Sequence, residues 1–198
     1  MVGIEEPEWL APWCEEHLGA ALEEVLFSSS QISVVFGIRL RDGTETVVKA
    51  RSEPLDRIYS CLQAQKQLAS EGFPCPMPVT LPKAVGNLTV HAETLLPGGD
   101  VLCGTSDEVA RTYADVFARL MTLLEPLKIR PPLPNPYWLR WEQLAAGIWP
   151  ELPWLSGCDS RDVPAFVVST ATRSSRRLHS ASLPYVLGHG DFEAQNVR

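Results

Sequence analysis

The amino-acid sequence predicts an α+β protein in which a small antiparallel sheet with one helix packed on it precedes a mostly helical part. Before residue 97, several short segments alternate between apolar and polar residues, as strands with one buried face do. After Pro97-Gly98-Gly99, apolar residues recur at steps of three and four, as on one face of a helix. We therefore expect two lobes, at 1–97 and 98–198.

The first lobe is expected to contain an N-terminal helix, a run of antiparallel strands and a second helix. Asp42-Gly43 marks a hairpin turn between two strands, because both residues tolerate positive φ. Ser28 to Gln31 is expected to form the turn before it. The predicted elements are a helix at 8–24, strands at 25–27, 33–41 and 44–51, a helix that Ser52 caps and Gly72 ends, and two strands within 79–96.

The second lobe is expected to begin with the most regular helix of the chain, at 106–125. Thr105 and Glu108 have the spacing of a capping box. Residues 130–160 are rich in proline and tryptophan and are expected to be irregular, and a last helix is predicted at about 163–180. A short strand-like run, 185–187, follows it.

Composition narrows the classes of function. The chain has 198 residues, is 45% hydrophobic and carries a formal net charge of -7, so nucleic-acid binding is not expected. Five cysteines without CxxC spacing form neither a disulfide framework nor a zinc site. The sequence shows no signal peptide and no segment apolar enough to span a bilayer. We expect a cytoplasmic protein that does not bind membranes, of unknown oligomeric state.

The segment Leu187–Asn196, with the sequence LGHGDFEAQN, carries the clearest chemical signal. It places Asp191 and Asn196 five residues apart, after a short apolar run. Phosphoryl transfer needs a carboxylate that orients the attacking hydroxyl and takes its proton, and an amide oxygen can bind Mg²⁺ without adding negative charge. The alternative is a chance turn, since Gly and Asp are common turn residues.

This segment resembles the catalytic loop of the aminoglycoside phosphotransferase and choline kinase family, in which His-Gly-Asp is followed five residues after the Asp by Asn. The resemblance implies a two-lobed, protein-kinase-like fold that binds ATP or GTP with Mg²⁺ and phosphorylates a small hydroxyl-bearing acceptor. It implies that Asp191 is the catalytic base, Asn196 a metal ligand and His189 a structural support of the loop.

The first lobe contains residues that suit a nucleotide site. Lys49 interrupts an apolar strand and shares a face with Val47, so that the ammonium can meet phosphates while the valine covers the base. A solvated lysine on an open sheet is the alternative. The resemblance further implies a hinge at Glu93 and Leu95, whose backbone would bind the adenine edge, and a loop that covers the phosphates at Ser28, Ser29 and Ser30.

One position departs from the family. Kinases pair the strand lysine with a glutamate of the following helix, and the corresponding position here falls near Gln63, which can hydrogen-bond Lys49 but not neutralise it. No acidic residue lies between Arg57 and Ser70. His91 is isolated in the sequence and is expected to be a surface or hydrogen-bonded histidine.

The sequence stops two residues after Asn196, before the second metal-binding Asp and the later helices of complete family members. We therefore expect a fragment that is inactive by itself, from an ATP-dependent phosphotransferase acting on an aminoglycoside or related alcohol. The alternative is a non-catalytic kinase-like module that binds a nucleotide or a partner.

Overall fold

The computed structural model describes residues 5–30, 33–99, 106–130, 133, 164–180 and 186–189. These residues belong to two compact units, one up to Leu133 and the other containing 164–180 and 186–189. The division into lobes after Pro97 stays a prediction. None of the described helices is long and apolar enough to cross a membrane.

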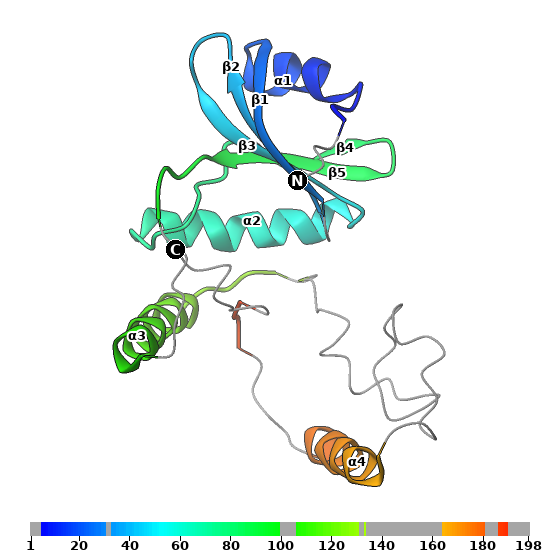
Figure 1. Cartoon of the computed structure of the whole chain (residues 1–198), viewed down its shortest axis with the longest axis vertical. Coiled ribbons are helices and arrows are strands. Elements are labelled where there is room, and N and C mark those ends of the chain that lie inside the picture. Colours follow the sequence, from blue (N-terminus) through cyan, green and yellow to red (C-terminus); the bar gives the residue numbers. More distant parts are fainter. Residues whose placement is uncertain are drawn as a thin grey trace. The chain divides into compact units, whose positions relative to one another are not determined.

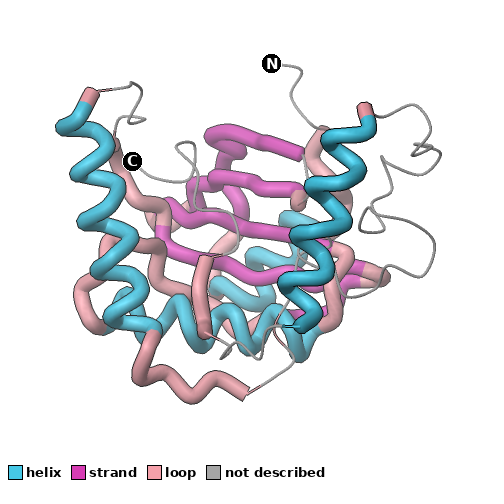
Figure 2. The backbone as a smooth tube through the Cα atoms, turned by 90° about the horizontal axis from the view of Figure 1, so that it is seen from below, coloured by secondary structure: helices cyan, strands magenta, loops and turns pink. Residues whose placement is uncertain are grey.

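A five-stranded antiparallel sheet forms the centre of the first unit and confirms the α+β prediction (Figures 1 and 2). Its spatial order is β1-β2-β3-β5-β4, so that β3 is the middle strand. The strands are β1 (Leu22–Ser30), β2 (Val34–Leu40), β3 (Glu45–Arg51), β4 (Lys83–Val85) and β5 (Leu88–Thr94).

The N-terminal helix α1 (Leu10–Leu18) is shorter than predicted, because Gly19 ends it with a left-handed φ of 78°. Residues 22–24, predicted as helix, belong to β1. The apolar spacing alone did not show this boundary, since an amphipathic pattern continues across the glycine.

The main hydrophobic core lies between α1 and one face of the sheet. Phe36 of β2 is fully buried there and meets the ring of Trp9 edge-on, with 6.2 Å between ring centroids. Strand residues of this face alternate with residues that point the other way, as the period of two requires. The core consists of Leu10, Trp13, Cys14, Phe36, Ile38, Leu40, Val48, Ala50, Val90 and Ala92.

Helix α2 (Leu55–Ser70) lies on the face of the sheet opposite α1 (Figure 1). Pro54 is its N-cap and no side chain caps it, so the predicted capping role of Ser52 is wrong. Gly72 ends the helix as predicted, with φ of 74° and a following hydrogen bond from Phe73 N to Leu68 O (3.0 Å).

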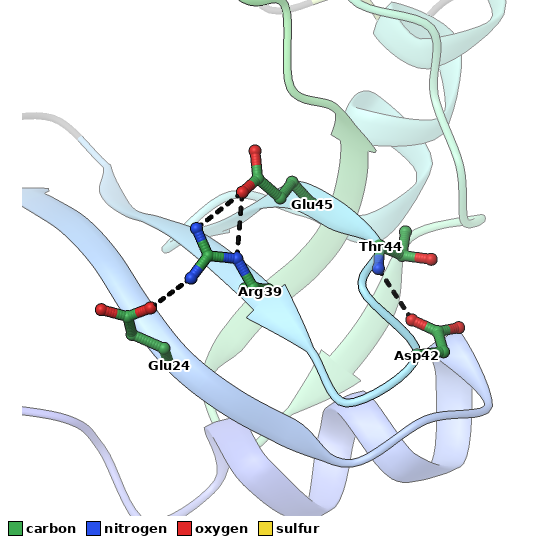
Figure 3. Close-up of polar contacts among 5 residues, drawn as sticks. All are labelled: Glu24, Arg39, Asp42, Thr44 and Glu45. Carbon is green, nitrogen blue, oxygen red and sulfur yellow. Dashed lines mark hydrogen bonds and ion pairs between the residues drawn. The ribbon is translucent and has the colours of Figure 1, made fainter.

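The β2–β3 hairpin turns at Asp42-Gly43 as predicted, and Gly43 has a φ of 85°. The backbone N–H of Thr44 donates to Asp42 Oδ1 (2.9 Å) and lowers the pKa of that carboxyl (Figure 3). Next to the turn, Arg39 links three strands by contacts with Glu24 on β1 (2.5 Å) and Glu45 on β3 (2.9 Å) (Figure 3). These pairs are exposed and so contribute little stability.

Helix α3 (Asp107–Leu124) begins one residue later than the capping box predicts. Ser106 is the N-cap, and its hydroxyl accepts a hydrogen bond from Val109 N (3.3 Å), whereas Thr105 lies outside the described residues. Arg119 donates to Gly72 O (2.7 Å) and so ties α3 to the end of α2.

In the second unit, helix α4 (Ala165–Ser180) follows Pro164, in agreement with the predicted helix at 163–180. Val186 and Leu187, which were expected to continue a strand, are not in a strand. Most of the segment 130–160, predicted as irregular, lies outside the described residues.

Candidate functional site

The side of the sheet that faces α2 carries a cluster of polar residues, which we call the lysine face. Residues directly opposite each other on antiparallel strands share a face, so the strand register defines its members. One row across the sheet is Phe27, Gly37, Val47 and Glu93, and the next row is Ser29, Val35, Lys49 and His91.

Lys49 on the middle strand is the centre of this face. Its side chain is 24% exposed, and its Nζ forms an ion pair with Oε1 of Glu93, which is 3% exposed. Lys49 lies opposite His91, and Glu93 is two residues further along β5, within reach of a long side chain. The alternative of a solvated lysine on an open sheet is therefore wrong.

Helix α2 contributes Gln65 to this cluster rather than the predicted Gln63, which is exposed. The side-chain amide of Gln65 donates to Glu93 Oε2 (2.9 Å) and to Pro76 O (2.8 Å). Helical periodicity explains the difference, because two residues along a helix turn the side chain by more than half a revolution.

His91 is buried beside the ion pair and does not fit the expectation of a surface or hydrogen-bonded histidine. It is 2% exposed, and its Nδ1 has no hydrogen-bond partner in the described part of the chain. Burial, assisted by the positive charges of Arg51 and Lys49 and opposed by Glu93, lowers the pKa of His91 to about 4. The imidazole is therefore neutral near pH 7.

Phe27 lies flat over Gly37 on the lysine face, at the end of the sheet row that includes Val47. A Cβ at position 37 would lie 2.0 Å from Phe27 Cε1, so only glycine lets the ring approach the strand this closely. The ring remains 45% exposed. Val47, on the far side of Gly37 in the same row, is 7% exposed, so Phe27 is the more exposed apolar residue of this row.

Gly37→Ala should displace the Phe27 ring and lower the free energy of unfolding by about 1 kcal/mol, the lower end for overpacking because the ring can swing into solvent. Urea unfolding of Gly37→Ala, Phe27→Ala and the double variant measures this. In the Phe27→Ala background the alanine at 37 should have almost no effect. An equal loss in both backgrounds would contradict the close approach.

The predicted serine turn is wrong, because Ser28, Ser29 and Ser30 are the last residues of β1 and pair with Phe36, Val35 and Val34 of β2. Only Ser29 falls in the row of Lys49, whereas Ser28 and Ser30 alternate to the α1 side. Gln31, predicted to be in this turn, lies outside the described residues.

The predicted hinge follows β5. The Thr46 hydroxyl donates to Glu93 O (2.7 Å), and Thr94 N donates to Met77 O (2.9 Å), so both groups are already bonded within the protein. Leu95 and Leu96 follow the strand, and in the described part of the chain their backbone N–H and C=O groups have no hydrogen-bond partner. These groups can bind the edge of a planar polar ring.

Comparison with known proteins gives a match at the level of structure. No protein-family model matches the sequence, and no curated protein matches it significantly. Amicoumacin kinase in complex with AMP-PNP, Ca²⁺ and Ami matches with a TM-score of 0.56 at 13% identity, over 81% of this chain and 49% of that protein. This chain has a kinase-like fold.

Other structures match at lower TM-scores, among them the following two. A protein from Thermobifida fusca described as a putative fructosamine-3-kinase has 17% identity and a TM-score of 0.49, over 91% of this chain and 65% of that protein. A thermostable mutant of the aminoglycoside phosphotransferase APH(4)-Ia has 16% identity and a TM-score of 0.43, over 60% and 40%. The chain thus spans about half the length of these kinases, from 40% to 65%.

Within the kinase-like fold, the structure brings together Lys49, Val47 and Glu93 from the predicted site, with Leu95 just beyond β5. Asp191 and Asn196 lie outside the described residues, and His189 lies in the second unit. No cluster of three or more possible metal-binding side chains occurs among the residues that were placed. The proposed catalytic loop therefore stays a prediction.

Three residues of the site were not predicted from the sequence, namely His91 and Phe27 of the lysine face and Gln65 of α2, which contacts it. The alternation of Val90 and Ala92 with His91 and Glu93 could have shown that both polar residues point to the face opposite the apolar core. No sequence signal could have shown that Glu93, expected to act through its backbone, also pairs with Lys49 through its carboxylate.

Proposed function

We propose that this chain is the nucleotide-binding part, with the start of the helical part, of an ATP-dependent phosphotransferase. The protein would transfer the γ-phosphate to a hydroxyl of a small molecule such as an aminoglycoside or related alcohol. The observation that carries the proposal is the lysine face: a partly exposed Lys49 on the middle strand, held by a buried carboxylate beside a strand-to-loop exit.

The lysine face suits a nucleoside triphosphate. The Lys49 ammonium has three donors and is accessible at the surface, so it can bind phosphate oxygens while it remains paired with Glu93. Phe27 and Val47 supply apolar contacts for a base, and the backbone of Leu95 and Leu96 supplies groups for its polar edge. Whether ATP or GTP is preferred depends on these last contacts.

Asp191 in this proposal orients the acceptor hydroxyl and takes its proton, while His189 braces the loop and Asn196 holds Mg²⁺. A nucleotide bound with Mg²⁺ supplies the transferable phosphoryl group and neutralises its charge. The match to amicoumacin kinase, which was solved with AMP-PNP and Ca²⁺, supports a nucleotide and a divalent cation as ligands. The proposed lobes are 1–97 and 98–198.

The proposal is tested by measuring ATP turnover by the protein that contains this chain, with a panel of aminoglycosides, sugars and amino alcohols as phosphate acceptors. Asp191→Ala should abolish transfer to any accepted substrate and leave MgATP affinity within about twofold, because the acceptor base contributes to the chemical step. Lys49→Ala should weaken MgATP binding by about tenfold or more, as loss of a charge-assisted phosphate contact does.

Retained turnover in Asp191→Ala would contradict the role of this residue. Nucleotide binding without transfer to any acceptor would favour the alternative, a non-catalytic kinase-like module. A protein that binds neither MgATP nor MgGTP would contradict both.

A further inference from the structure

Glu93 is unusual because it is an almost fully buried carboxylate with both oxygens occupied. Its Oε1 pairs with Lys49, and its Oε2 accepts a hydrogen bond from Gln65 of α2 (2.9 Å). The Gln65 amide is itself held by Pro76 O (2.8 Å). A buried charge is unfavourable unless it is paired and hydrogen-bonded, and Glu93 meets both conditions.

We propose that Glu93 is the carboxylate that positions Lys49 for phosphate binding, so that strand β5 supplies the anchor that helix α2 supplies in other kinases. This inference rests on the proposed function, because it assumes that Lys49 binds nucleotide phosphates. In kinases with a helix carboxylate, the ion pair forms only when the helix is in place. Here both partners belong to one sheet, and Gln65 provides a neutral link to the helix.

The register explains why this arrangement is rigid. Lys49 pairs with His91 and Val47 pairs with Glu93, so β3 and β5 hold the lysine and the carboxylate at a diagonal separation that backbone hydrogen bonds maintain. The position of Lys49 thus depends on the sheet and not on a movement of α2. Glu93 consequently acts through Lys49 and is a positioning residue.

Stability alone does not account for this pair, because buried ion pairs stabilise proteins little or not at all relative to apolar residues of similar size. Lys49 also keeps donors that no other described residue uses, since Glu93 is its only ion-pair partner among them. A lysine that is fixed on one side and open on the other is suited to bind an anion.

The decisive measurement compares the affinities for MgATP and for adenosine, because adenosine occupies the base site without using Lys49. Glu93→Gln keeps the side-chain shape and removes the charge, so it should weaken MgATP binding about tenfold and change adenosine affinity by less than about twofold. Titration calorimetry measures both. Glu45→Gln, at an exposed carboxylate on β3 that pairs with Arg39, is the matched control and should change neither affinity.

A double variant that moves the carboxylate from β5 to α2 tests whether the lost MgATP affinity can be restored. The double variant Glu93→Gln/Gln65→Glu moves the carboxylate from β5 to α2, to the other side of the same hydrogen bond. It should recover at least half of the lost MgATP affinity, since Lys49 again has an anionic neighbour. Gln65→Ala tests the link without removing the buried charge, and it should weaken MgATP binding about threefold with adenosine unaffected.

Several results would overturn the inference while leaving the proposed function intact. One is that Glu93→Gln and Gln65→Ala bind MgATP as tightly as the unaltered protein does, although Lys49→Ala binds MgATP more weakly. Another is a parallel loss of MgATP and adenosine affinity, which would mean that Glu93 only maintains the fold at the hinge. If the unaltered protein binds neither ligand, the proposed function itself fails. Should Glu93→Gln not fold, Gln65→Ala with the two ligands still separates these outcomes.

Discussion

Phe36→Ala should lower the free energy of unfolding by about 3–5 kcal/mol, the range for removing a large aromatic side chain from a packed core. Phe36 is 0% exposed and lies between the sheet and α1, with Trp9 edge-on at 6.2 Å. Alanine leaves a cavity that the strand cannot close, because hydrogen bonds to β1 and β3 hold the backbone of β2 on both sides. Urea unfolding monitored by tryptophan fluorescence measures the loss.

Phe27→Ala is the matched control, since Phe27 lies on the other face of the same sheet and is 45% exposed. It should lower the free energy of unfolding by about 1 kcal/mol. Comparable losses in the two variants would mean that the two faces of the sheet are not packed as described. A smaller loss for Phe36→Ala than for Phe27→Ala would reverse the assignment of the core.

Lowering the pH from 7 to 4 should destabilise the protein through His91 by about 3 kcal/mol. The folded-state pKa of His91 is about 4 because of burial, whereas the ordinary histidine pKa of 6.5 applies to the unfolded chain. Between these values the unfolded state binds a proton that the folded state does not. The contribution of the neutral His91 to the free energy of unfolding is therefore complete above about pH 6.5 and is lost progressively as the pH falls toward 4.

The contribution of His91 is isolated by comparing the unaltered protein with His91→Gln, because many carboxylates also titrate in this range. Urea unfolding at pH 7 and at pH 4.5 should show a larger loss of stability in the unaltered protein. The pKa of His91 is shifted by the charges of Arg51, Lys49 and Glu93. All three residues are kept in His91→Gln, so the two proteins differ only in the histidine. Equal pH dependence in both proteins would show that His91 does not titrate in the buried, unpaired state.

Most secondary structure was predictable because it depends on local signals. The Asp42-Gly43 turn, the β3 strand and the end of α2 at Gly72 occur where the sequence placed them. Apart from the strand expected at 185–187, the errors lie at boundaries: β1 extends from Leu22 through Ser30, since pairing with β2 outweighs the turn preference of serine. Likewise, α1 ends at Gly19 although the apolar pattern continues.

The candidate site was predictable in part. A lysine in an apolar strand pointed to Lys49, which lies at the centre of the lysine face, whereas the hinge at the Pro-Gly exit stays a prediction. The predicted Gln63 lies two residues before Gln65, which makes the contact with Glu93, because a resemblance in sequence does not fix which side of a helix faces the sheet. The isolated histidine His91 became a buried neighbour of the ion pair only through strand pairing.

The sequence alone was sufficient to establish the α+β class, the order of the elements and the alternation that puts Lys49 and Val47 on one strand face. The tertiary structure was needed to show that β5 lies beside β3, which brings the Glu93 carboxylate to Lys49 and positions Gln65 behind it. The physical reason is that periodicity is a property of one segment, whereas strand order and register depend on packing between segments distant in sequence.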